Sequence, residues 1–284
     1  MIASARTSDS VGGQDRPKQR LETVVVDVGN STVSVARWVD GGISHRTDTP
    51  LQQAASSFPE QPCAEVMKHI AELASQRKDV VLPVVICSVV PVFREALVAG
   101  IRSALNVEPY VVGDQIPLPC DVKLDEPDAV GVDRVCASAA AYEAKKEPCI
   151  VVDFGSAITV GLVDGEGAFA GGAILPGLAM QSVALHEQTA VLPLVKTNPP
   201  TGAIGTNTTD AIRAGIWFGA AGAVRHLVEQ MAERIGRWPP VVATGGQAAE
   251  LSQAVGIFDN VVPDLCLLGV GIAYRKWNAS AVIL

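Results

Sequence analysis

Two segments of the sequence share one pattern, and this repetition constrains the fold more than any other feature. Residues 23–42, TVVVDVGNSTVSVARWVDGG, run from an apolar stretch through Asp-x-Gly and small polar residues into a second apolar stretch and turn glycines. Residues 150–167, IVVDFGSAITVGLVDGEG, repeat this order, and Asp27 and Asp153 hold equivalent places 126 residues apart. Each segment predicts a strand hairpin, and the pair predicts an internal duplication.

Strands and helices are predicted to alternate after each hairpin. The first hairpin is followed by predicted elements at 64–76 (helix), 80–91 (buried strand), 92–105 (helix), 109–113 (strand) and 131–146 (helix). The second is followed by a Gly-rich loop at 171–178, a helix from about Ala179, a loop at 193–209, a helix at 210–236, a strand at 240–246, and helices at 247–255 and 265–277. Such alternation is typical of the α/β class.

The length of the chain favours two domains. A chain of 284 residues is at the size where a single hydrophobic core tends to divide into two. We expect domains at 21–146 and 147–284. Residues 1–20 are polar and rich in Ser, Gly and charge, lack the apolar segment of a signal peptide, and are predicted to be a mobile leader.

Charge and cysteine usage exclude several classes of protein. No apolar run is long enough for a bilayer helix, so we expect no membrane partner. A net charge of -8 argues against nucleic acid as a partner, since backbone binding needs clustered cations. The six cysteines form no C-x-x-C pair and the four histidines show no metal-ligand spacing. We interpret the cysteines as reduced core residues of a cytoplasmic protein.

The turn of each hairpin has the chemistry of a phosphate site. Glycine permits close approach of a ligand, exposed N–H groups and hydroxyls cradle phosphoryl oxygens, and a carboxylate holds magnesium through water. A single Asp-x-Gly hairpin is more often an ordinary turn. Two matched hairpins, together with the strand end VVATGG at 241–246, instead favour a nucleotide cleft in which the third element meets the adenosine or ribose.

Six motifs then occur in an order that resembles one family. DVGNS, GVDR, DFGSAIT with GGAILPGL, TAVLP, IGTNTTDAIRAGIWFG and ATGG are similar, over roughly residues 22–275, to type III pantothenate kinases of the acetate kinase, sugar kinase, Hsp70 and actin superfamily. The resemblance implies two actin-like (ribonuclease H-like) domains with mixed sheets flanked by helices, and a homodimer. It also implies transfer of the γ-phosphoryl group of ATP to pantothenate, the first step toward coenzyme A.

The resemblance assigns roles to residues. It makes Asp133 the catalytic carboxylate, which orients the substrate hydroxyl and accepts its proton; a helix N-cap is the alternative for this residue. It implies that pantothenate contacts Gly131, Val132, Asp133, Arg134, Thr208, Leu124 and Thr189, with loop capping as the alternative for both threonines. It implies that ATP contacts Asp27, Val28, Gly29, Asn30, Ser31, Thr32, Val33, Ser34, Ser156, Gly245 and Gly246.

The implied cofactors beside ATP are two cations. Asp27 would hold Mg²⁺ through water, and Asp153 would hold a monovalent cation, K⁺ or NH₄⁺. A carboxylate that ends a buried strand needs a cation or hydrogen-bond partners, because an isolated buried charge is unfavourable.

Two positions depart from the family pattern. Leu124 stands where the family commonly has a pantothenate-contacting Tyr, and Gly161 stands where the second hairpin usually has an Asp. Two alternatives therefore stay open. The first is a non-catalytic or regulatory relative that binds ATP or a pantothenate-like ligand. The second is a kinase of the same superfamily that acts on another small hydroxylated substrate.

Overall fold

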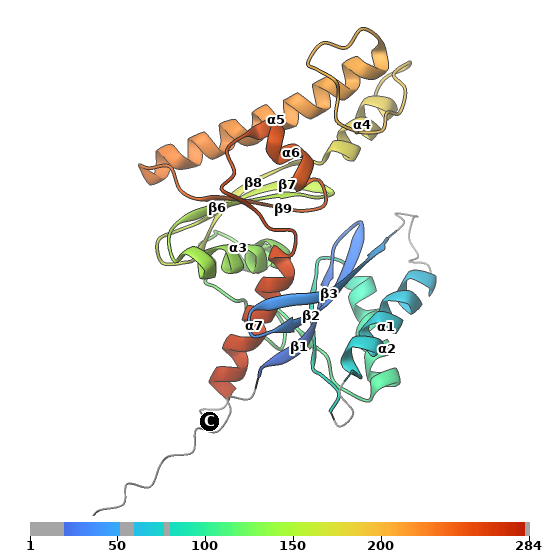
Figure 1. The fold of residues 1–284 in the computed structure, drawn as a ribbon, viewed down its shortest axis with the longest axis vertical. Coiled ribbons are helices and arrows are strands. Elements are labelled where there is room, and N and C mark those ends of the chain that lie inside the picture. Colours follow the sequence, from blue (N-terminus) through green and yellow to red (C-terminus); the bar gives the residue numbers. More distant parts are fainter. Residues whose placement is uncertain (1–19, 52–59, 77–79, 282–284) are drawn as a thin grey trace, which may run out of the picture.

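The fold consists of two α/β halves of similar topology (Figure 1). The computed structural model describes residues 20–51, 60–76 and 80–281. The predicted leader, residues 1–20, lies outside these ranges apart from Arg20. Within the described ranges, no helix is long and apolar enough to cross a membrane.

The first half is a five-stranded mixed sheet in the order β3-β2-β1-β4-β5. Its strands are β1 (Glu22–Val28), β2 (Thr32–Val39), β3 (Gly42–Pro50), β4 (Val84–Ser88) and β5 (Tyr110–Val111). The first three strands are antiparallel, and β4 and β5 run parallel to β1. Helices α1 (Glu60–Ala74) and α2 (Pro91–Leu105) pack on the face to which Val24, Val26 and Val28 point.

The second half repeats this arrangement, with the strand order β10-β9-β6-β7-β8. Its strands are β6 (Cys149–Phe154), β7 (Ala157–Val163), β8 (Phe169–Pro176), β9 (Val241–Thr244) and β10 (Asn260–Val261). On one side lie α4 (Leu178–Glu187), α5 (Thr208–Ile235) and α6 (Ala248–Val255), whose apolar residues share a core with Val152 and Phe154. The internal duplication predicted from the two hairpins is therefore confirmed, as are the mixed sheets flanked by helices.

Two helices connect the halves by packing. Helix α3 (Val132–Lys145) ends the first half of the chain, yet Ala137, Ala140 and Ala141 pack against the second sheet. Helix α7 (Leu265–Ala281) ends the chain, yet Leu267, Val270 and Tyr274 pack against the first sheet. The two helices also touch, since a Cβ at Gly269 would lie 2.0 Å from the Cys136 carbonyl oxygen. The predicted domain boundary at 146/147 stays a prediction. Helices α3 and α7 each pack against the sheet on the other side of this boundary.

The predicted loop at 171–178 is wrong. Most of it belongs to β8, which pairs antiparallel with β7 and extends the second hairpin to three strands. Its glycines fit a bulged pairing, because a Cβ at Gly172 would lie 1.9 Å from the Val160 carbonyl oxygen. The equivalent edge strand of the first half, β3, was not predicted, because its sequence GISHRTDTP is mostly polar.

Candidate active site

The turns of the two hairpins meet between the sheets. Ser31, between β1 and β2, and Ser156, between β6 and β7, have their Oγ atoms 2.5 Å apart. The Gly29 N–H donates to the Thr32 carbonyl at 3.0 Å, and the Gly155 N–H donates to the Ala157 carbonyl at 3.2 Å. Both turns therefore close on themselves at a glycine and present their hydroxyl residues to each other.

Three carboxylates gather beside these turns. Asp27 lies near the end of β1, Asp153 near the end of β6, and Asp133 in the first turn of α3. Burial, followed by the charges of Asp133 and Asp153, raises the pKa of Asp27 to about 7. Burial and the charge of Asp133 raise the pKa of Asp153 to about 6, and burial also raises the pKa of Asp133. Negative charge concentrated in this way favours a bound cation.

The residues fit a hard cation. Oδ1 of Asp27 is buried and accepts no hydrogen bond from the described residues. A buried acceptor without a partner is unfavourable, and a metal ion or its water shell would satisfy it. Carboxylate oxygens are the ligands that Mg²⁺ prefers. Asp27 can therefore hold magnesium, which when bound would neutralise the charge of nucleotide phosphates.

The end of β9 lies directly against Asp153. Thr244 and Asp153 are register partners in the parallel pair of β9 and β6. Gly245 follows with φ +95°, and a Cβ there would lie 2.2 Å from Oδ1 of Asp153. Gly246 is exposed, and a Cβ there would meet nothing within 4 Å. Of the two predicted nucleotide glycines, the first is required by packing and the second borders open space.

The start of α3 presents Asp133 and Arg134. The N-cap of the helix is Gly131, so the alternative interpretation of Asp133 as the N-cap is wrong. Asp133 instead uses Oδ1 to accept the Arg134 N–H at 2.8 Å. The Arg134 guanidinium lies 5.0 Å from the centroid of the Phe169 ring, and its Nε is buried without a hydrogen-bond partner among the described residues. No motif in the sequence pointed to Phe169.

Both departures from the family pattern lie against β8. A Cβ at Gly161 would approach Cε2 of Phe169 to 3.0 Å, so the Phe169 ring covers the position where the family has a carboxylate. Leu124 Cδ2 would lie 3.3 Å from a Cβ at Gly171. The segment before Leu124 is attached to the same strand, because the Lys123 N–H donates to the Phe169 carbonyl at 2.9 Å.

Other residues of the predicted ATP site differ in whether their side chains are accessible to a nucleotide. The side chains of Val28 and Val33 are fully buried in the core of the first half, so only their backbone could meet a nucleotide. The Ser34 hydroxyl donates to Oδ1 of Asp48 at 2.7 Å. Asn30 and Ser31 are exposed.

The structure places the two predicted threonines elsewhere. Thr189 and Thr208 line a cavity of about 1120 Å³ between α4 and α5, on the side of the second sheet opposite α3 (Figure 1). The lining of this cavity includes none of the three carboxylates. The Thr189 hydroxyl donates to the Leu185 carbonyl at 2.8 Å and accepts the Leu192 N–H at 3.3 Å, as the loop-capping interpretation predicts. Thr208 is the first residue of α5, whose N-cap is Asn207.

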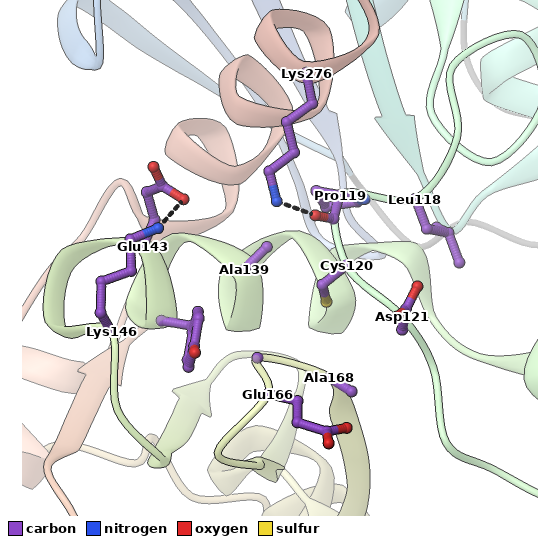
Figure 2. A pocket seen from close by; sticks show the side chains of 12 residues that line it. Leu118, Pro119, Cys120, Asp121, Ala139, Glu143, Lys146, Glu166, Ala168 and Lys276 are labelled. Carbon is purple, nitrogen blue, oxygen red and sulfur yellow. Dashed lines mark hydrogen bonds and ion pairs between the residues drawn. The ribbon is translucent and has the colours of Figure 1, made fainter. Parts of the chain in front are cut away.

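A smaller pocket of about 290 Å³ lies on another part of α3, beside the chain at 118–121 (Figure 2). Its cations are paired: Lys276 donates to the Pro119 carbonyl at 2.7 Å, and Lys146 contacts Glu143 at 2.8 Å. None of the predicted site residues lines this pocket. It is separate from the three carboxylates.

Comparison with known proteins gives a consistent family. A family model described as type III pantothenate kinase matches residues 23–230. A type III pantothenate kinase of Dehalococcoides mccartyi is 34% identical over 265 residues, which cover 90% of this chain and 98% of that protein. One of Thermomicrobium roseum is 33% identical, with coverage of 90% and 98%. A solved structure from Campylobacter jejuni, described as a Baf family transcriptional activator, has a TM-score of 0.54 at 18% identity, covers 92% of this chain and 100% of its own, and shows the fold alone.

Proposed function

The chain belongs to the type III pantothenate kinase family, and we propose that it transfers the γ-phosphoryl group of ATP to the primary hydroxyl of pantothenate. The product is 4'-phosphopantothenate, the first intermediate on the route to coenzyme A. The observation that carries this proposal is the convergence of Asp27, Asp133 and Asp153 beside two joined hairpin turns. Phosphoryl transfer depends mainly on positioning and on neutralisation of charge, and this arrangement is suited to both.

Asp133 is the proposed catalytic residue. Burial raises its pKa, which makes its carboxylate a better proton acceptor than an exposed aspartate. The carboxylate would orient the pantothenate hydroxyl and take its proton late in the transfer. The neighbouring Arg134 is suited to the carboxylate of pantothenate, since a guanidinium binds carboxylates through paired hydrogen bonds.

ATP is proposed to bind against the two hairpin turns. Asn30 and Ser31 are exposed on the first turn, and the Ser31 hydroxyl meets the Ser156 hydroxyl of the second turn, so both turns offer polar groups to phosphates. Asp27 would hold the magnesium ion, through water, beside them. Gly245 and Gly246 would receive the nucleoside part, because the second of them borders open space.

A coupled assay with ATP, magnesium, potassium and pantothenate tests the assignment. We expect turnover, a fall of about 10²- to 10⁴-fold in kcat for Asp133→Ala, and little change for Asp128→Ala, an exposed aspartate of the preceding short helix. No turnover above the Asp133→Ala background would contradict the kinase assignment and favour a non-catalytic role. Turnover by Asp133→Ala at the wild-type rate would remove that residue from the mechanism.

We also propose a monovalent cation at Asp153. The carboxyl lies near the end of a buried strand, and its raised pKa reflects burial and the nearby charge of Asp133, both of which a bound cation would offset. Replacement of potassium by sodium should lower the kcat of the wild type. The residual activity of Asp153→Asn should be the same with either ion. Equal rates with both ions in the wild type would contradict a selective site.

We propose that the enzyme is a homodimer that pairs through α4 and α5. The cavity lined by Thr189 and Thr208 is apolar on this exposed face, where Met180 is 49% exposed. A second copy on this face would bring these threonines to a partner's substrate. Light scattering should show a dimer that Met180→Glu breaks and that Val92→Glu, at a similarly exposed position of α2, leaves intact. A wild-type monomer would contradict this pairing.

The cytoplasm is the proposed location. All six cysteines are free thiols, as expected in a reducing compartment. Fractionation of the producing cells, with activity followed in each fraction, tests this assignment.

A further inference from the structure

Three cysteines from separate elements converge beneath Asp27. Cys87 lies on β4 as the register partner of Asp27 on β1, Cys136 lies on α3, and Cys266 lies on α7. Register partners in neighbouring strands point to the same face of a sheet, so the Cys87 side chain lies beside the Asp27 carboxyl. Each of the three thiols contacts the other two.

Three potential ligand atoms of this cluster are close together. Sγ of Cys87, Sγ of Cys266 and a carboxylate oxygen of Asp27 all lie within 4.8 Å of one another. Tetrahedral zinc, with Zn–S bonds of about 2.3 Å and Zn–O bonds of about 2.0–2.2 Å, places its ligands roughly 3.5–3.8 Å apart. Small side-chain movements would bring the three atoms to that spacing.

The Asp27 carboxyl is hydrogen-bonded to the Cys266 thiol, yet one of its oxygens supplies an independent indication of a ligand. Oδ1 of Asp27 is buried and accepts no hydrogen bond from the described residues. Asp27 and Cys266 are each partly exposed while Cys87 is buried, so an ion would enter from the side of the carboxyl. Cys136 backs the other two thiols and is available as a further sulfur.

We propose that Cys87, Cys266 and Asp27 form a binding site for a thiophilic divalent ion of the zinc class. Thiolates select such ions over magnesium, which prefers oxygen, and binding releases the thiol protons to solvent. Because Asp27 is shared, an ion here would take that carboxylate from the nucleotide and inhibit the kinase. This consequence rests on the proposed function, whereas binding of the ion does not.

Titration of the full chain with Cd²⁺ tests the site through its thiolate-to-metal ultraviolet band. The double variant Cys87→Ser/Cys266→Ser removes one buried and one half-buried thiol. The matched control, Cys120→Ser/Cys149→Ser, also removes one thiol of each kind, so four thiols remain in both variants. We expect the band to saturate at one equivalent in the wild type and the control, and to be absent at one equivalent in the first variant. Asp27→Asn should retain the band with weaker affinity.

A second measurement uses only the wild type, so it tests the site even if the double variant fails to fold. One equivalent of Cd²⁺ should slow alkylation of Cys266 in the wild type, followed by mass spectrometry, and leave Cys63 on α1 unaffected. An unchanged rate at Cys266, or a band of full size in folded Cys87→Ser/Cys266→Ser, would overturn the proposal.

Competition with nucleotide separates the two proposals. Excess Mg-ATP should weaken Cd²⁺ binding if both need Asp27. Tight Cd²⁺ binding that ATP does not affect would leave the thiol site established and contradict the nucleotide role of Asp27.

Discussion

The Oγ atoms of Ser31 and Ser156 lie 2.5 Å apart although the two residues are 125 positions apart in the chain. They occupy the turns of the two duplicated hairpins, so this hydrogen bond joins the halves beside the ends of the strands that carry Asp27 and Asp153. The same hydroxyls are the proposed phosphate contacts. The two hairpin turns are therefore held together by the same hydroxyls that are proposed to contact the phosphates of ATP.

A double-mutant cycle measures this hydrogen bond. Ser31→Ala and Ser156→Ala should each lower the free energy of unfolding, and the double variant should lower it by less than the sum. The expected coupling is about 0.5–1.5 kcal/mol, the net value of one hydrogen bond. Urea unfolding of the four proteins gives it. Ser31→Ala combined with Ser252→Ala on α6 should be additive, and equal additivity in both pairs would show that the hydroxyls do not interact in solution.

Stability should fall with rising pH because of the site carboxyls. Burial raises the pKa of Asp27 to about 7 and of Asp153 to about 6, from the ordinary value of 3.8. Between these values the folded state binds more protons than the unfolded state, so the free energy of unfolding decreases from about pH 4 to 7 and is then constant with respect to these groups. At about 1.4 kcal/mol per pKa unit, the difference between 3.8 and about 7 corresponds to roughly 4 kcal/mol, so Asp27→Asn should raise the free energy of unfolding at pH 8 by up to about 4 kcal/mol.

The difference between the variant and the wild type isolates this effect. Other groups titrate in both proteins, so urea unfolding at pH 5, 6, 7 and 8 should show a gap that widens with pH and disappears near pH 4. Asp128→Asn, at an exposed position, should follow the wild type throughout. A gap that is constant with pH would mean that the Asp27 carboxyl is not perturbed.

Phe169 is expected to position Arg134 for substrate. The guanidinium lies 5.0 Å from the ring centroid, and such a contact contributes about 0.5–2 kcal/mol. Phe169→Leu should therefore raise the KM for pantothenate by about 2- to 30-fold and leave the KM for ATP near its original value. Phe93→Leu, at a buried aromatic of α2, should lower stability without this effect. Parallel changes in both KM values would indicate general damage to the fold.

The sequence predicted the parts of the fold that depend on local pattern. The hairpins at Asp27 and Asp153 combine apolar stretches with turn glycines, and the structure confirms both hairpins, together with the duplication that they indicated. The edge strands β3 and β8 were missed, because a polar or glycine-rich strand at an edge has little local signal and forms only when its neighbour offers a ladder.

The contacts that complete the site are long-range and left no local pattern. Three features depend on packing between distant segments. Helix α3 packs against the second sheet and α7 against the first, Arg134 contacts Phe169, and Cys87, Cys136 and Cys266 lie together. The sequence interpretation of the cysteines as core residues holds for Cys87, Cys136 and Cys149, whereas the other three are only partly buried. It could not show that three of the six cysteines lie together.

Two adjacent glycines should respond in opposite ways to the same substitution. Gly245 has φ +95°, and a Cβ there would lie 2.2 Å from Oδ1 of Asp153 and 2.7 Å from the backbone of Phe154. Gly245→Ala must therefore move the end of β6 as well as adopt a left-handed backbone, so we expect a loss of about 2–4 kcal/mol in the free energy of unfolding. It should also abolish most kinase activity, because the displaced group is the Asp153 carboxyl.

Gly246→Ala is the matched control for this prediction. A Cβ at this exposed position meets nothing within 4 Å, so the change in the free energy of unfolding should stay within about 0.5 kcal/mol. If the nucleoside of ATP binds over Gly246, the added methyl group should raise the KM for ATP and leave the KM for pantothenate unchanged. An unaltered KM for ATP would contradict binding of the nucleoside at this strand end. Equal stabilities of the two variants would contradict the close approach at Gly245.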